Sequence, residues 1–150
     1  MLPNLMEFDR MSSAGYLVNH MARLFAEQLR DRIAPLGIVP GQFPALLALW
    51  EHDGLTQKEL LELVAIEQAT LANTLARMER DNLITRKEHP ADARAKTIHL
   101  TEKALQIRRA AYDAANATNA KALEGLTEAE RAMFLELMRR TIATLSEKNP

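Results

Sequence analysis

Apolar residues recur every three or four positions through most of this 150-residue chain, and this spacing predicts amphipathic helices. One stretch, residues 83–101, lacks that spacing and instead has two short strand-like segments around a polar loop. Five glycines and six prolines are too few for a sheet-rich fold with many turns. We therefore expect a mainly α fold with a small β-hairpin. The expected helices cover residues 13–34, 42–51, 56–64, 67–81 and 101–123, with a last helix from 127.

Composition narrows the class of protein further. The chain has the length of one domain, and 47% hydrophobic with 26% charged residues is typical of a globular protein. The absence of cysteine excludes disulfides, cysteine metal sites and thiol redox chemistry. The first residues have no basic start followed by a long apolar run, so we expect no signal peptide, no membrane partner and a cytoplasmic location. With a net charge of −1, any contact with nucleic acid would need locally arranged positive charge.

Two short helices joined by a tight turn, residues 56–64 and 67–81, have the layout of a helix-turn-helix. Thr56 and Glu59 form a capping-box pattern at the first helix, and Thr127 with Glu130 repeats it at the last one. Asn82 follows the second helix where left-handed backbone geometry commonly ends a helix. These signals set the expected helix ends.

The second of these helices has the two faces that a DNA-reading helix needs. Leu71, Leu75 and Met78 share one face and are expected to pack inward. The opposite face carries no acid, and its polar side chains can donate and accept hydrogen bonds to base edges and phosphates. Any surface helix also turns polar residues outward, so this pattern alone leaves DNA binding open. The candidate residues are Gln68, Ala69, Thr70, Asn73, Thr74 and Arg77, with Arg80 on the same face.

The hairpin of residues 83–101 strengthens the DNA-binding interpretation. Its apolar residues can anchor two strands against the helices, and the loop around Pro90 would then project with Arg94 at its tip. An exposed guanidinium suits the narrow, negative minor groove of A·T-rich DNA. Asp92 could hold Arg94 by a charge-assisted bond, although an isolated pair of this kind is usually only a weak surface salt bridge. Residues 67–96 hold six positive and five negative side chains, so the arrangement of charge matters more than its sum.

Residues 36–104 resemble the MarR family of winged-helix transcription regulators. The most specific segment is "PADARAKTIHLTEKA", residues 90–104, which is similar to the family's D-x-R-x-K pattern followed by L-T-x-K. Departures are Ala65 and Asn82, where the family often has Gly, and Ala93, at a site often filled by Arg.

The resemblance implies a winged helix-turn-helix lobe at about residues 36–100 within a single domain of residues 1–150. Residues 11–34 and 101–147 would supply the helices of an obligate homodimer. The recognition helix would enter the major groove of double-stranded DNA at a pseudo-palindromic operator, and the wing the minor groove. The implied DNA-binding residues are Gln68, Ala69, Thr70, Asn73, Thr74 and Arg77 on the helix and Asp92, Arg94 and Lys96 on the wing.

The resemblance further implies a repressor that a small aromatic or phenolic ligand releases from DNA. Side chains from the first two helices could line the ligand cavity, although Met and aromatic residues at helical spacing more often simply form the core. The four histidines are scattered and no catalytic set is recognisable, so we expect no metal, no cofactor and no enzyme activity. The competing interpretation is a winged-helix protein-interaction module without DNA binding. The candidate pocket residues are Tyr16, His20, Met21, Phe43, Leu46, Leu47 and Trp50.

Overall fold

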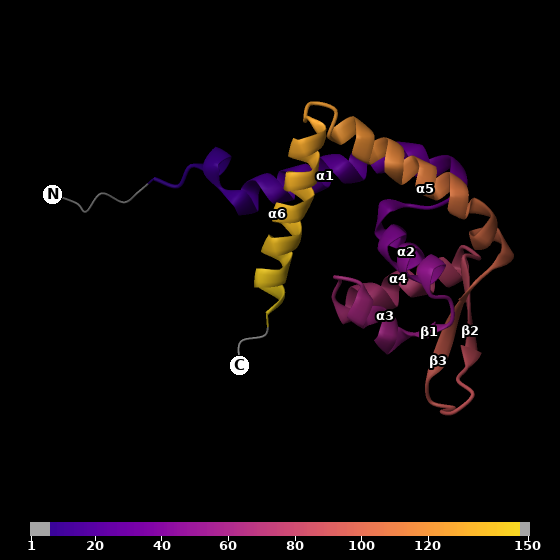
Figure 1. Cartoon of the computed structure of the whole chain (residues 1–150). Coiled ribbons are helices and arrows are strands. Elements are labelled where there is room, and N and C mark those ends of the chain that lie inside the picture. The colour runs from indigo at the N-terminus through magenta and orange to yellow at the C-terminus, as the bar shows by residue number, and fades with distance from the viewer. Residues whose placement is uncertain (1–6, 148–150) are drawn as a thin grey trace.

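The structure of the protein, a computed structural model, describes residues 7–147. Figure 1 shows two long helices, α1 and α5, lying side by side above a lobe that contains α2, α3, α4 and a small sheet. The expected mainly α class with a β wing is confirmed. In chain order the elements are η1 (Arg10–Ser12), α1 (Ala14–Ile33), η2 (Ala34–Leu36), η3 (Pro40–Gln42), α2 (Phe43–Glu51), β1 (Leu55–Thr56), α3 (Gln57–Leu63), α4 (Gln68–Arg80), β2 (Ile84–Glu88), β3 (Lys96–Leu100), α5 (Glu102–Ala122) and α6 (Glu128–Ser146), where η denotes a 3-10 helix.

The helix ends form where the sequence places them. Glu59 N donates to Thr56 Oγ1 at 3.1 Å and Thr56 N donates back to Glu59 Oε1 at 3.2 Å, which completes the capping box of α3. Thr127 and Glu130 make the same reciprocal pair at α6, with distances of 2.9 and 3.2 Å. Asn82 has a φ of 61°, the left-handed geometry expected after α4. Both predicted capping boxes and the predicted turn are confirmed.

The sheet has one strand more than the sequence predicted. It is antiparallel with the order β1-β3-β2, and the two residues of β1 pair with β3 through the registers Leu55↔Ile98 and Thr56↔Thr97. Asp53 reinforces this edge, because its Oδ1 accepts a hydrogen bond from Leu100 N at 2.9 Å. A two-residue strand is too short to show alternation, which is why the sequence pattern missed it. The additional strand β1 ties the middle of β3 to the start of α3.

The core of the lobe lies between α4, α2 and the sheet. The inward face of α4 is buried as predicted, and so are the four side chains expected to anchor the hairpin. Trp50 of α2 is also buried, with its Nε1 donating to Ala104 O at 3.0 Å, so its one polar atom is satisfied inside the core. This packing fixes α4 and the wing on a common base. The residues in question are Leu71, Leu75 and Met78 of α4 and Leu83, Ile84, Ile98 and Leu100 of the hairpin.

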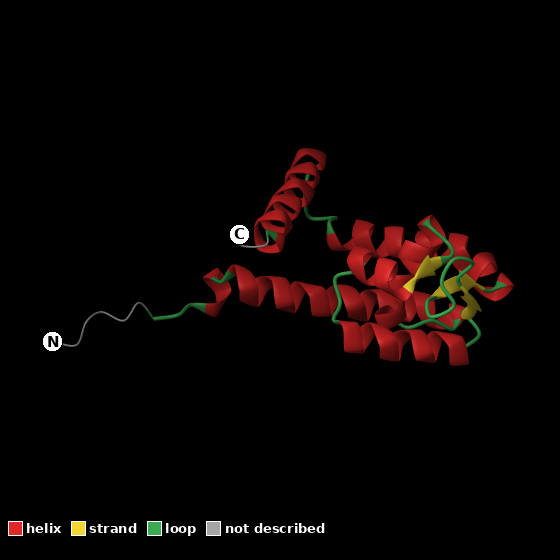
Figure 2. Ribbon diagram, turned by 90° about the horizontal axis from the view of Figure 1, so that it is seen from below, coloured by secondary structure: helices red, strands yellow, loops and turns green. Residues whose placement is uncertain are grey.

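The two ends of the chain leave apolar side chains in solvent. Figure 2 shows α6 leaning away from the body and the start of α1 extending beyond it. Phe8 is 79% exposed, Ile142 62% and Leu145 81%. Among residues 7–147 no single helix is long and apolar enough to cross a membrane; only α1–η2 and η3–α2, taken together across a 90° bend, pass on length and composition. Exposed apolar side chains on helices that extend from the body of a globular protein often mark an interaction surface.

Candidate nucleic-acid interface

The outer face of α4 is polar and open to solvent. Because Leu71, Leu75 and Met78 turn inward every three or four residues, the positions between them face outward. Asn73 and Arg77 are exposed there one turn apart. Gln68, Ala69 and Thr70 are exposed near the N-terminal end, and Thr74 is half-buried. The structure thus brings the six candidate residues of this helix onto accessible positions of one element.

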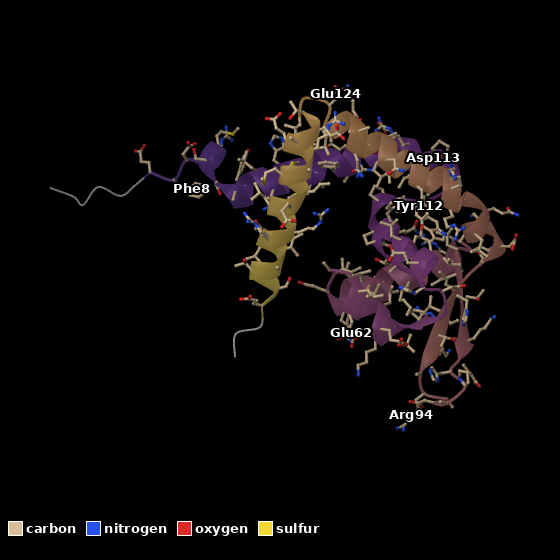
Figure 3. All side chains as sticks on the ribbon, viewed as in Figure 1. Phe8, Glu62, Arg94, Tyr112, Asp113 and Glu124 are labelled. Atoms are coloured by element: carbon tan, nitrogen blue, oxygen red, sulfur yellow. The ribbon has the colours of Figure 1, made fainter. Side chains whose placement is uncertain are left out.

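The tip of the hairpin is organised by Asp92. Its Oδ1 accepts a hydrogen bond from Arg94 N at 3.0 Å and lies 3.7 Å from Arg94 Nε. Two backbone bonds close the loop beneath it, His89 N to Ala95 O and Ala95 N to Asp92 O, both at 3.1 Å. The Arg94 side chain is 96% exposed, and Figure 3 shows it at the far end of the hairpin, directed away from the body. The Asp92 carboxylate therefore shapes the loop that presents an exposed guanidinium.

A basic cleft lies between the hairpin and the start of α3. It has a volume of about 410 Å³ and is lined by four cationic side chains and no acidic one. Arg86 Nη1 donates to Gln57 Oε1 of α3 at 3.3 Å, and its Nε lies 3.6 Å from Glu79 Oε2 of α4. Arg86 therefore links the hairpin to α3 and α4. The exposed cations along the cleft are the remaining three of its four cationic side chains. The four cationic residues are Lys58, Arg86, Arg94 and Lys96.

Sequence reasoning missed Lys58 and Arg86 as parts of this surface. Neither belongs to the recognition helix or to the wing motif, and they are 28 positions apart in the sequence. They meet because β1 pairs with β3 and so brings the start of α3 to the hairpin. The sequence signal that could have indicated this surface is the arginine at position 86, which lies on the expected strand between the apolar Ile84 and the polar loop. Lys96, which was predicted, lines the same cleft and is exposed.

The residues expected to line a ligand pocket do not gather around one cavity. A cavity of about 520 Å³ between α1, α5 and α6 includes Met21. A second one of about 340 Å³, which we call the η3 cavity, includes Phe43 and Leu47. Tyr16 and His20 line neither of these cavities; they lie near the start of α1 with ring centroids 6.2 Å apart. Leu46 and Trp50 are buried in the core.

The titratable groups with shifted pKa values serve structure rather than chemistry. The hydrogen bond from the Thr56 side chain lowers the pKa of Glu59, and the bond from the Thr127 backbone lowers the pKa of Glu130. The Gln42 side chain likewise lowers the pKa of Asp81. Within residues 7–147 no group of three or more His, Asp or Glu side chains is placed to hold a metal ion. The cationic side chains of the basic cleft and the exposed Arg94 suit binding to a polyanion.

Comparison with known proteins agrees with this geometry. The family model described as MarR family matches residues 38–96. The chain is 36% identical to the organic hydroperoxide resistance transcriptional regulator of Bacillus subtilis over 110 residues, which is 71% of this chain and 75% of that protein. It is 30% identical to the HTH-type transcriptional repressor NicR of Pseudomonas putida over 135 residues, 90% of this chain and 85% of the relative.

Solved structures show the same fold. The PcaV transcriptional regulator of Streptomyces coelicolor, crystallised in complex with its natural ligand, superposes with a TM-score of 0.83 at 25% identity. The match covers 93% of this chain and 98% of that one, so it includes the long outer helices as well as the lobe. The fold, the helix-turn-helix with its basic wing and the sequence relatives lead to one conclusion: the chain belongs to the MarR family of winged-helix transcriptional regulators.

Proposed function

We propose that the protein is a dimeric, sequence-specific DNA-binding repressor that acts by binding and not by catalysis. In this proposal α4 enters the major groove and the hairpin enters the adjacent minor groove of double-stranded DNA. The observation that carries it is that α4 and the hairpin are connected into one surface. Arg86 of the hairpin contacts both α3 and α4, while the polar face of α4 and the Arg94 side chain stay exposed. Base edges are read by polar side chains on a helix, and phosphates by cations beside it.

Each DNA-facing element has a distinct part in this proposal. Asn73 is the best base reader on α4, because its amide can both donate and accept at the exposed centre of the helix. Arg77, one turn later, suits a phosphate. Arg94 suits the minor groove, where a guanidinium sheds water more readily than an ammonium does. Gln68, Ala69, Thr70 and Thr74 complete the surface of α4, and Lys96 that of the wing.

The outer helices are proposed to form the dimer. Residues 11–34 and 101–147 carry most of the exposed apolar side chains of the two chain ends, while residues 36–100 would form the DNA-binding lobe. Burying Met133, Ile142 and Leu145, all more than half exposed, against a second copy would remove apolar surface from water. A two-fold dimer then presents two α4 helices to two successive turns of DNA.

Release by a small aromatic ligand is the remaining part of the proposal. The η3 cavity and the larger cavity beside α6 are both mainly apolar, which suits a compact aromatic molecule. Among relatives, NicR is named a repressor, and PcaV was crystallised with a natural ligand. A cytoplasmic location is part of the same proposal.

The proposal is tested by footprinting the purified full-length protein on the DNA upstream of its own gene. Protection of a pseudo-palindrome with half-sites about 10 bp apart is expected, since this is one turn of the duplex. Binding should weaken steeply with salt, because cations on the protein release counterions from the phosphates. A protected site without two-fold symmetry, or salt-independent binding, would contradict the proposal. A folded dimer that protects no DNA would favour the protein-interaction module.

A further inference from the structure

Gln42 is one of two buried polar side chains among the described residues, the other being Thr118. It is 4% exposed and lies at the junction between η3 and α2. Its Oε1 accepts a hydrogen bond from Val39 N at 3.2 Å, and its Nε2 donates to Asp81 Oδ2 at 3.0 Å. A buried amide is costly unless its polar atoms are paired, so both bonds hold it firmly in place. The second bond crosses 39 residues of chain to reach the end of α4.

The partner of Gln42 is the residue that ends the candidate recognition helix. Asp81 is the C-cap of α4, and the backbone there is held from the α5 side as well. Lys103 Nζ donates to Asp81 O at 3.1 Å, and Thr101 Oγ1 donates to Asn82 O at 2.7 Å. From the η3–α2 side, the Gln42 side chain holds the C-terminal end of α4 through its hydrogen bond to Asp81. The hydrogen bond also lowers the pKa of Asp81, as expected when a donor favours the charged carboxylate.

Close neighbours of Gln42 in the sequence line a cavity. Pro40 and Phe43 line the η3 cavity, together with side chains of α1 and with Ala115 of α5. None of the residues that line this cavity carries a charge, so an occupant of matching chemistry is a neutral aromatic or aliphatic group. Residues 40–43 therefore have two roles: Pro40 and Phe43 form part of the cavity wall, and Gln42 is hydrogen-bonded to the end of α4. A shift of that wall would therefore also displace the side chain that is hydrogen-bonded to the end of α4.

We propose that Gln42 is a positioning residue: it ties the C-terminal end of α4 to the wall of the η3 cavity, so that filling the cavity alters how α4 reads DNA. The inference rests on the proposed function. A helix of 13 residues is about 20 Å long, so a small tilt at its end displaces Asn73 relative to the bases. Base recognition needs hydrogen-bond geometry within a few tenths of an ångström, whereas phosphate contacts carry no sequence information.

The first test is the substitution Gln42→Met, which keeps the side-chain length and removes both hydrogen bonds. Operator DNA and an unrelated duplex of the same length are titrated at one salt concentration. The ratio of the two affinities should fall at least about fivefold, the contribution of a weak base contact, while binding to the unrelated duplex stays unchanged. Gln106→Met, on the exposed surface of α5, is the matched control and should leave the ratio intact.

A swap separates positioning from a general loss of stability. Gln42→Glu alone sets a carboxylate against Asp81 and should lower the ratio as much as Gln42→Met does. Adding Asp81→Asn restores the hydrogen bond in the reverse direction, with the new amide at position 81 donating to the new carboxylate at position 42. The double variant should therefore recover most of the discrimination between operator and unrelated DNA. If Gln42→Met discriminates as well as wild type, or if the swap fails to rescue while all variants melt well above the assay temperature, the positioning role is wrong.

The link to the cavity is tested by filling it. Ala115→Met extends a side chain into the η3 cavity and should lower the operator ratio in the wild-type background. In the Gln42→Met background the same substitution should have little further effect, because the connection to α4 is already lost. Equal effects in both backgrounds, or no effect in wild type, would overturn the link. Wild-type protein that binds no DNA would instead overturn the proposed function, so the two failures are distinguishable.

Discussion

The basic cleft makes a quantitative prediction about salt. Lys58 is exposed at the start of α3 and lines the cleft, so it is expected to contact one phosphate in each half of a dimer complex. Each phosphate contact contributes about 0.9 to the slope of log affinity against log salt, so Lys58→Gln should reduce the slope by about 1.8 per dimer. Between 50 and 200 mM salt, wild type should then lose about twelvefold more affinity than the variant.

The assay is a titration of labelled operator at four or more salt concentrations for each protein. Lys121→Gln is the matched control, because Lys121 pairs with Glu124 at 3.0 Å at the junction between α5 and α6, remote from the cleft. Removing a cation from the first turn of α3 also relieves an unfavourable interaction with the helix dipole, so the melting temperature of Lys58→Gln should not fall. An unchanged salt slope for Lys58→Gln would show that the cleft does not contact phosphate.

Three further predictions concern α4, the dimer and acid stability. Asn73→Ala should cost about 1–3 kcal/mol at its cognate base and blur specificity there; equal discrimination by wild type and variant, in titrations of operator and single-base mutants, would exclude base reading. Deleting residues 127–150 should give a monomer that binds no operator, and a truncated protein that sediments as a dimer would refute the assignment of the interface. Because the pKa of Asp81 is lowered on folding, its contribution to stability is present above the ordinary aspartate pKa of about 4 and is lost as the pH falls through the folded value. Urea unfolding of Asp81→Asn should therefore show a weaker loss of stability below that pH than wild type, and parallel pH profiles would contradict the role of the Gln42 bond.

Local features of the fold were predictable because the residues that make them are neighbours in sequence. A capping box needs residues three apart, and Thr56 with Glu59 shows it directly. The same holds for Asn82 after α4 and for the Asp92–Arg94 pair at the hairpin tip, which lies two residues apart in sequence and 3.7 Å apart in the structure. The inward face of α4 follows from a period of 3.6 residues alone.

Features that need long-range contacts were not predictable in this way. Strand β1 is defined by pairing with β3, more than 40 residues away, and the cleft that joins Lys58 to Arg86 depends on that pairing. The pocket hypothesis came from the family resemblance, whereas helical spacing identifies the apolar residues but not the cavity that each one faces. Trp50 shows the difference: its ring lies in the core, where its Nε1 donates to a backbone carbonyl of α5.

The central claim, that the hairpin is a DNA-reading wing, is tested most directly at Arg94. Its side chain is 96% exposed and makes no contribution to the core, so Arg94→Ala should keep the dimer and the melting temperature. Titration of labelled operator at one salt concentration should nevertheless show that most of the affinity is lost. Arg94→Lys should restore little of it, because an ammonium lacks the planar fork and is more strongly hydrated. If Arg94→Ala binds operator as tightly as wild type, the hairpin does not read DNA and the account of this protein as a winged-helix regulator with a minor-groove contact is wrong.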